Sequence, residues 1–216
     1  MTETAAVRPI DDSPMFEATR RRLTARQAEV VMQLVEATEE VANEAGYVGL
    51  TVRSVARRAG VAPATAYTYF GSKDHLLAEV LWRRMQALPP VDASEDRPMH
   101  ERLVDAVLAM VVFTTENPGL VDACTVALLS TSPDVKHLRD RIGAQIHRRL
   151  SAVLGPECDR RVVSVLETTF SGALLTAGMG HMSSMDIPEF VAGAADLLVA
   201  GVATTPGTGK RRSGRR

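Results

Sequence analysis

The chain is poor in aromatic residues and in cysteine. Of its 216 residues 4% are aromatic, and its two cysteines, Cys124 and Cys158, show neither metal-type spacing nor the pairing of a disulfide framework. No apolar run approaches the length that spans a bilayer, and the first twenty residues lack the apolar core of a signal peptide. We therefore expect a cytoplasmic protein with no membrane partner, in which both cysteines are ordinary thiols.

Groups suited to catalysis or metal binding are also sparse. The five histidines have no ligand spacing with Cys, Asp or Glu, and there is no Ser-His-Asp set and no glycine-rich phosphate loop. We expect no catalytic residue, no metal and no cofactor. Adjacent acids such as Glu39 and Glu40 are most simply explained as solvated charge on the exposed side of a helix.

Charge is distributed unevenly, although the formal net charge is only −1. Residues 45–90 contain six basic and two acidic side chains, whereas residues 89–205 contain nine basic and fifteen acidic ones. The first segment suits phosphate groups and the larger second segment does not.

Helical periodicity dominates the chain, and neither an alternating strand nor an internal repeat stands out. We predict an all-α fold. Residues 1–22 are expected to form a flexible arm whose basic cluster at positions 20–22 favours disorder over insertion into a minor groove. Prolines near position 89 mark the boundary between an N-terminal domain, residues 23–88, and a helical domain, residues 89–203. Residues 204–216 are predicted to be a disordered basic tail.

Four helices are expected in the N-terminal domain, and their boundaries follow from caps and breakers. The first covers residues 24–45 and ends at Gly46, and the second covers residues 52–59 between Thr51 and Gly60. Pro63 begins the third, and Ser72 caps the fourth. Further helices are expected at residues 99–116, 119–129, 133–154, 156–179 and 187–202.

The second and third helices are short and joined by a glycine turn, which suits entry into a major groove about 12 Å wide. Periodicity turns Ala66 and Phe70 inward and places Thr65, Thr68 and Tyr69 on the opposite face. Arg53, Ser54, Arg57 and Arg58 remain outside on the second helix. For Arg57 and Arg58 a solvated face and a phosphate contact are equally good interpretations.

The run LTVRSVARRAGVAPATAYTYFGSKDHLLAEVL, residues 50–81, resembles the DNA-binding domain of the tetracycline-repressor (TetR) family of bacterial regulators. The resemblance covers residues 24–88 and implies a helix-turn-helix that binds double-stranded DNA. It implies phosphate contacts from Thr51, Tyr69 and Lys73. For Tyr67 it implies a contact with the DNA backbone, and a purely structural role in packing is the alternative. It further implies that the base edges are read by Arg53, Pro63, Ala64, Thr65 and Thr68.

Three alanines depart from the family pattern. The family often has serine at Ala62 and glycine at Ala64, and the usual leucine is replaced by Ala66. Ala62 removes a hydroxyl that would cap the third helix, and Ala66 fills less of the core behind it.

The last two helices are rich in small residues, which let helix backbones approach one another. The resemblance implies that they form a four-helix bundle across a two-fold axis in a homodimer, and an intramolecular core is the alternative. It also implies a ligand pocket in the C-terminal helices. The candidate lining residues, each of which also suits the core, are Met110, Phe113, Thr114, Phe170 and Leu174.

The favoured hypothesis is a sequence-specific DNA-binding transcriptional regulator, a repressor that a small and mostly apolar effector releases from a palindromic operator. An architectural DNA-binding protein without an effector is the main alternative. A small all-α enzyme is a third, and the missing catalytic constellation counts against it.

Overall fold

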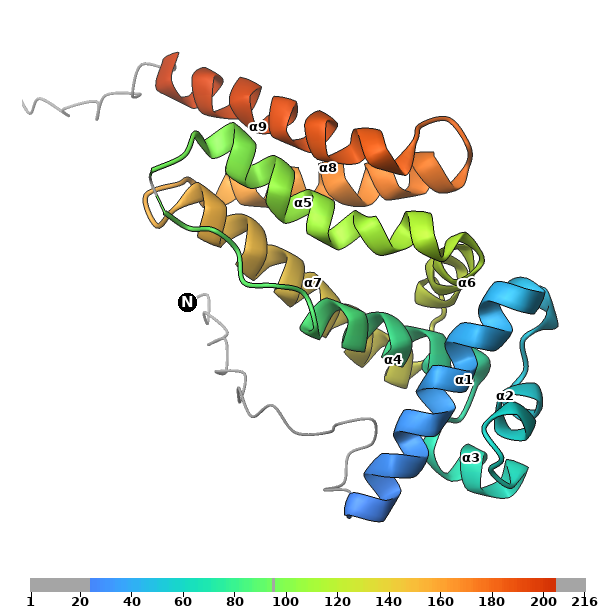
Figure 1. The fold of residues 1–216 in the computed structure, drawn as a ribbon. Helices are drawn as coiled ribbons and strands as arrows, with labels where there is room; N and C mark the ends of the chain where they lie inside the picture. The colour runs from blue at the N-terminus through green and yellow to red at the C-terminus, as the bar shows by residue number, and fades with distance from the viewer. Residues whose placement is uncertain (1–23, 95, 205–216) are drawn as a thin grey trace, which may run out of the picture.

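A computed structural model describes residues 24–94 and 96–204, apart from the side chains of residues 113–116, 118 and 202–204. Within this range the chain forms α-helices and one short 3-10 helix and contains no strand, which confirms the predicted fold class (Figure 1). The elements are α1 (Ala25–Gly49), α2 (Val52–Arg58), α3 (Pro63–Tyr69), α4 (Lys73–Gln86), α5 (Met99–Glu116), α6 (Pro118–Leu128), α7 (Pro133–Leu154), α8 (Arg160–Gly178), η1 (Ser184–Asp186) and α9 (Ile187–Thr204). The predicted arm, residues 1–22, and the tail beyond residue 204 lie outside the described residues.

Helix ends follow the caps that the sequence indicates. Thr24, Thr51 and Ser72 precede α1, α2 and α4, and each side-chain oxygen accepts a hydrogen bond from the backbone N–H three residues later. The start of α8 was expected at residue 156 but lies at Arg160. Residues 156–158 form a turn instead, and the Asp159 side chain then caps the helix by accepting from the Arg161 N–H at 2.8 Å.

The end of α1 differs from the prediction in one respect. Gly46 leaves the helical conformation, with φ of 60°, but a further turn continues to Gly49. Ala45, the last residue of the predicted first helix, is exposed. The chain beyond the kink folds back over it, so that a Cβ added to Gly49 would lie 2.7 Å from the Ala45 Cβ.

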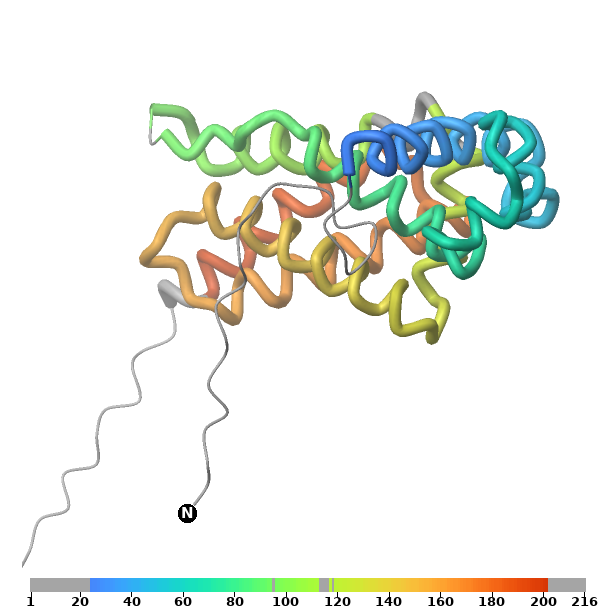
Figure 2. Tube along the Cα trace, turned by 90° about the horizontal axis from the view of Figure 1, so that it is seen from below, coloured from blue at the N-terminus to red at the C-terminus, as the bar shows by residue number. Residues whose placement is uncertain are grey.

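Helices α1–α3 form a head at one end of the molecule, and α5 with α7–α9 forms a bundle at the other (Figures 1 and 2). The two parts have separate hydrophobic cores. The head core contains residues of α1–α4 and also four residues of α6, namely Leu120, Ala123, Cys124 and Ala127. Burial raises the pKa of the Cys124 thiol to about 12, as expected for an inert core cysteine.

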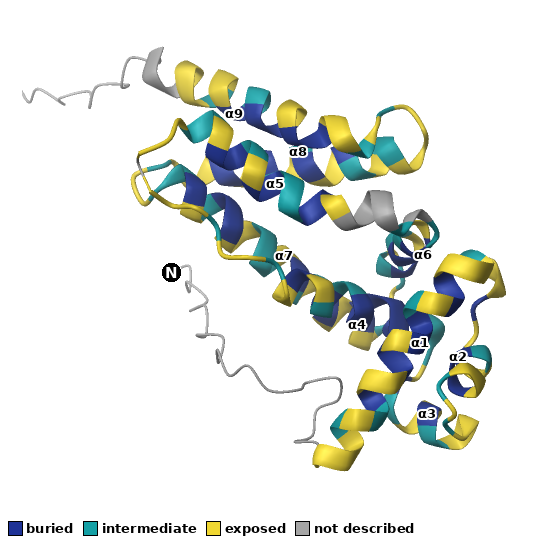
Figure 3. Cartoon of the chain, viewed as in Figure 1, coloured by how far each residue is buried: buried dark blue, intermediate teal, exposed yellow. Residues whose placement is uncertain are grey.

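Helix α4 belongs to both cores, and Figure 3 shows it largely buried between head and bundle. Leu76, Leu77 and Val80 pack in the head, whereas Trp82 and Met85 pack in the bundle. Helix α4 is therefore a shared structural element of the two parts.

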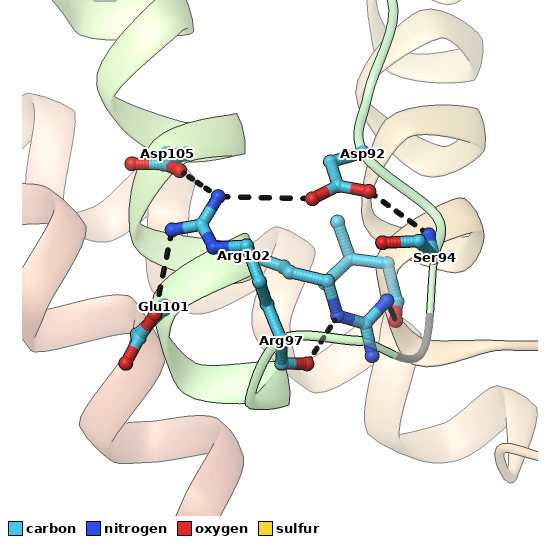
Figure 4. Close-up of polar contacts among 7 residues, drawn as sticks. Asp92, Ser94, Arg97, Glu101, Arg102 and Asp105 are labelled. Carbon is cyan, nitrogen blue, oxygen red and sulfur yellow. Dashed lines mark hydrogen bonds and ion pairs between the residues drawn. The ribbon is translucent and has the colours of Figure 1, made fainter.

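The connection from α4 to α5 is held by arginine side chains. Arg97 contacts three carboxylates, Asp105 at 2.8 Å, Glu101 at 3.5 Å and Asp92 at 3.7 Å (Figure 4). The buried Arg102 donates from Nε to the Arg97 carbonyl oxygen at 3.1 Å and from Nη1 to the Val153 carbonyl oxygen at 3.0 Å. These bonds tie the connection to the end of α7.

Candidate nucleic-acid interface

The turn between α2 and α3 has the hydrogen bonds of a Schellman motif. The Gly60 N–H donates to the Arg57 carbonyl and the Val61 N–H donates to the Ala56 carbonyl, with Gly60 at φ of 68°. This left-handed residue reverses the chain, so that α3 begins three residues later at Pro63. The Ala62 side chain makes no cap hydrogen bond, and the start of α3 rests on its backbone carbonyl, which accepts from the Thr65 and Ala66 N–H groups.

Helix α3 presents the two faces that the sequence predicts. Ala66 and Phe70 are fully buried in the head core. The outer face contains Pro63, Ala64 and Thr68, which are exposed, and Tyr67, which is 48% exposed. Thr65 and Tyr69 are only half-buried, and Tyr69 packs against the head core, so it lies at the edge of the outer face.

The three arginines of α2 have different surroundings. Arg53 and Arg57 are exposed, and their side chains have no hydrogen bond or ion pair with the part of the chain that the structure describes. Arg58 instead donates from Nη1 to Glu40 and Glu44 of α1, both at 2.9 Å, and its Nη2 also pairs with Glu44. These bonds raise the pKa of Arg58 and lower that of Glu44. Glu40 lies on the exposed side of α1, as expected, and is also an ion-pair partner of Arg58, whereas Glu39 is half-buried, contrary to the expectation.

Lys73 lies at the start of α4, but its amino group is engaged within the head. Its Nζ donates to the Tyr47 carbonyl oxygen at 2.7 Å and lies 3.7 Å from the centre of the Tyr47 ring. The Tyr47 hydroxyl donates to Asp74 Oδ1 at 2.7 Å, and this bond raises the pKa of Tyr47. Tyr47 was not predicted from the sequence, because its only local signal is that it is an aromatic residue beside the break at Gly46.

Within the described residues of the head, the positive charge available to a ligand is therefore concentrated on α2. The two basic residues near the end of α4 have acidic partners, since Arg83 pairs with Glu79 at 2.8 Å and Arg84 pairs with Glu39 of α1. Arg26, in the first turn of α1, is exposed as well and was not singled out by the sequence. The amino end of α1 and helix α3 lie at the same end of the molecule (Figure 1).

The candidate effector residues lie in the bundle. Met110 and Phe170 are buried in its core, and Leu174 packs against it. The side chains of Phe113 and Thr114 lie outside the described residues. Among the residues described, no three His, Cys, Asp or Glu side chains are grouped to hold a metal ion, and no helix has the length and apolar character to cross a membrane.

Two short helices packed at a glycine turn, with small polar groups and exposed arginines on the outer face, define a helix-turn-helix DNA-binding protein. Residues 34–80 match the family model of bacterial regulatory proteins, tetR family. The chain is 40% identical over 198 residues to uncharacterized HTH-type transcriptional regulators of Mycobacterium tuberculosis and Mycobacterium bovis, covering 91% of either sequence. The chain therefore belongs to the tetR family and is a DNA-binding transcriptional regulator.

Another relative is the HTH-type transcriptional repressor KstR of Mycolicibacterium smegmatis, 28% identical over 183 residues, which cover 80% of this chain and 88% of KstR. A TetR transcriptional regulator from Rhodococcus sp. RHA1 has the same fold, with a TM-score of 0.64, 22% identity and coverage of 81% of this chain and 98% of that one. FadR of Bacillus subtilis, solved with stearoyl-CoA, also has this fold, with a TM-score of 0.60, 22% identity and coverage of 79% and 98%.

Proposed function

We propose that the protein is a homodimeric repressor that binds a palindromic operator through α2 and α3 and is released by a small, mostly apolar effector. The observation that carries the DNA-binding part is the outer surface of these two helices, where Arg53 and Arg57 are exposed and have no acidic partner among the residues that the structure describes. The small side chains of α3 beside them allow close approach to base edges. Repression is also the activity of the relative KstR, an HTH-type transcriptional repressor.

Within this interface each predicted residue has a proposed contact. Arg53, Pro63, Ala64, Thr65 and Thr68 face the base edges, whereas Thr51, Tyr67 and Tyr69 contact the sugar-phosphate backbone. Lys73 can reach a phosphate only if its amino group gives up or shares its hydrogen bond to the Tyr47 carbonyl. Its contribution to affinity is therefore smaller than that of the exposed Arg57.

The surface of α8 and α9 supports dimer formation. It exposes large apolar side chains, including Leu197 at 79%, Phe190 at 50% and Leu175 at 48%. A Cβ added to Gly172 or Gly178 of α8, or to Gly193 or Gly201 of α9, would meet nothing within 4 Å. Such a surface suits a second copy of the same two helices, because small residues allow close packing and apolar ones drive association.

Selection of bound sequences from random DNA tests the DNA-binding function, and enrichment of an inverted repeat is expected. Light scattering at micromolar concentration should give the mass of a dimer. Gly172→Arg should give a monomer that binds the full operator weakly. Gly143→Arg is the matched control, because Gly143 is an exposed glycine of α7 that also has open space around it. If no sequence were enriched, the proposed function would be wrong.

The effector can be tested through Trp82, the single tryptophan of the chain. Its ring is buried in α4 between head and bundle, and the Arg141 guanidinium of α7 lies 4.5 Å from the ring centre. A displacement of α4 against α7 should therefore change its fluorescence. Stearoyl-CoA, which FadR binds in its solved structure, is a reasonable first probe, with coenzyme A as control. If a broad set of lipophilic compounds changed neither fluorescence nor operator affinity, the effector-free architectural protein would be the better description.

A further inference from the structure

Helix α3, at the outer end of the head (Figure 1), has no side chain of the kind that makes bidentate contacts with a base. Its sequence, PATAYTY, contains no arginine, lysine, asparagine, glutamine, aspartate or glutamate. Bidentate hydrogen bonds from arginine or lysine to guanine, and from asparagine or glutamine to adenine, are the usual means of reading purines in the major groove. Within the proposed interface α3 must therefore distinguish bases by another feature.

The exposed surface of α3 presents small apolar groups. Pro63, Ala64 and Thr68 are exposed, and the last two are four residues apart, so their Cβ atoms lie on the same side of the helix. Ala64 stands where the family often has glycine, and it adds a methyl group in the first turn of the helix. The amino end of a recognition helix is the end that contacts base edges. A pair of methyl groups is thus placed where bases are read.

The hydroxyl group of Thr68 is engaged within the helix. Its Oγ1 donates to the Ala64 carbonyl oxygen at 3.1 Å. A threonine hydroxyl has a single proton, so this bond leaves none to donate to a base. The staggered arrangement at Cβ directs the γ-methyl group away from the carbonyl oxygen that holds Oγ1. The methyl group is therefore the part of Thr68 best placed to contact a base edge.

Thymine is the base that presents a methyl group in the major groove, on C5. Contact between this group and a methyl group of α3 removes apolar surface from water on both sides. The burial of one methyl group changes affinity about fourfold. Cytosine in the same place presents an amino group and no methyl group, so the apolar contact is lost.

We propose that the methyl groups of Ala64 and Thr68 determine operator specificity by packing against the C5 methyl groups of thymine. The positions of each half-site that α3 covers are then A·T pairs, and Arg53 of α2 supplies the polar contact beside them. Recognition of thymine rests on the proposed DNA-binding function and specifies which feature of the bases α3 contacts.

The first measurement uses the full-length protein and a duplex that it selects from random DNA. Each thymine is replaced in turn by uracil, which pairs with adenine in the same way and lacks only the C5 methyl group. Fluorescence anisotropy gives the affinities. Replacement under α3 should weaken binding about fourfold in each half-site. Replacement in the flanking sequence should leave the affinity unchanged.

Two variants of Thr68 separate its methyl group from its hydroxyl group. Thr68→Ser removes the methyl group and keeps the hydroxyl, whereas Thr68→Val keeps a methyl group and removes the hydroxyl. One uracil-sensitive position should lose its sensitivity in Thr68→Ser and retain it in Thr68→Val.

Ala64→Gly should abolish the sensitivity at a second, neighbouring position. Ala62→Gly is the matched control, because it removes an exposed methyl group just before α3, at a cap position that tolerates glycine. It should leave the sensitivity to uracil unchanged at every position. The melting temperature of each variant is measured alongside.

Each outcome has a distinct meaning. If the wild type enriches no sequence, the proposed function fails and thymine recognition with it. If it enriches an operator that tolerates uracil at every thymine, the proposed function stands and thymine recognition is wrong. If the sensitivity is unchanged in Thr68→Ser and Ala64→Gly, or is lost in Thr68→Val but not in Thr68→Ser, the methyl groups do not read the base and the proposal is overturned.

Discussion

The three arginines of α2 allow one comparison in which the same charge is removed from a single short helix. Arg53→Ala removes an exposed side chain proposed to read a base edge. If it forms a bidentate contact with guanine, its loss costs about 1–3 kcal/mol, or roughly 5- to 150-fold in affinity, and relaxes the preference at one base pair. Arg57→Ala should weaken binding to all sequences alike and reduce the slope of log affinity against log salt by about 0.9, the value of one phosphate contact.

Arg58→Ala removes the same formal charge with a different expected result. Because Glu40 and Glu44 already accept from this guanidinium, its charge is compensated within the head, and the salt slope should stay unchanged. The measurement is fluorescence anisotropy with the selected duplex and its single-base variants at several salt concentrations. Melting temperature is measured alongside for each variant. The reasoning is refuted if Arg58→Ala lowers the salt slope as much as Arg57→Ala, or if Arg53→Ala leaves base preference intact.

Three further predictions concern stability. Burial raises the pKa of Glu79 despite its bond to Arg83, so stability should fall as pH rises above about 4.5, and Glu79→Gln should raise the melting temperature at neutral pH. Burial lowers the pKa of His75, against the opposing effect of Asp134, so stability should fall as pH drops below about 6.5. His75→Gln should flatten that acid limb in thermal melts. Gly60→Ala should cost about 1 kcal/mol in urea unfolding, because alanine is strained at this left-handed φ, and an unchanged midpoint would contradict this account of the turn.

Local features of the head could be predicted from the sequence. The inward positions of Ala66 and Phe70 follow from helical periodicity. Both ends of α2 and the start of α3 follow from Thr51, Gly60 and Pro63. Each of these signals acts within a few residues of the structure that it determines. The family match adds the DNA-binding class, because the motif lies within this locally determined segment.

Features that depend on distant partners could not be predicted in this way. Arg57 and Arg58 are neighbours with the same side chain, and only the packing of α2 on α1 decides that Arg58 meets Glu44. The amino group of Lys73 is engaged in a hydrogen bond to the carbonyl oxygen of Tyr47, 26 residues earlier. The candidate effector residues Met110 and Phe170 illustrate a further limit, since apolar residues on the inner face of a helix suit a core and a pocket equally.

The sharing of helices between the two cores explains why a change in the bundle should reach the DNA-binding surface at all. Helix α3 ends at Tyr69 and α4 begins at Lys73, so the connection between them is too short to absorb a movement of α4. Leu76 and Leu77 keep the first half of α4 in the head, while Trp82 and Met85 keep the second half in the bundle. A tilt of α4 must therefore repack one core or carry α3 with it. Since close-packed cores resist continuous deformation, movement of the head as a unit is the easier response.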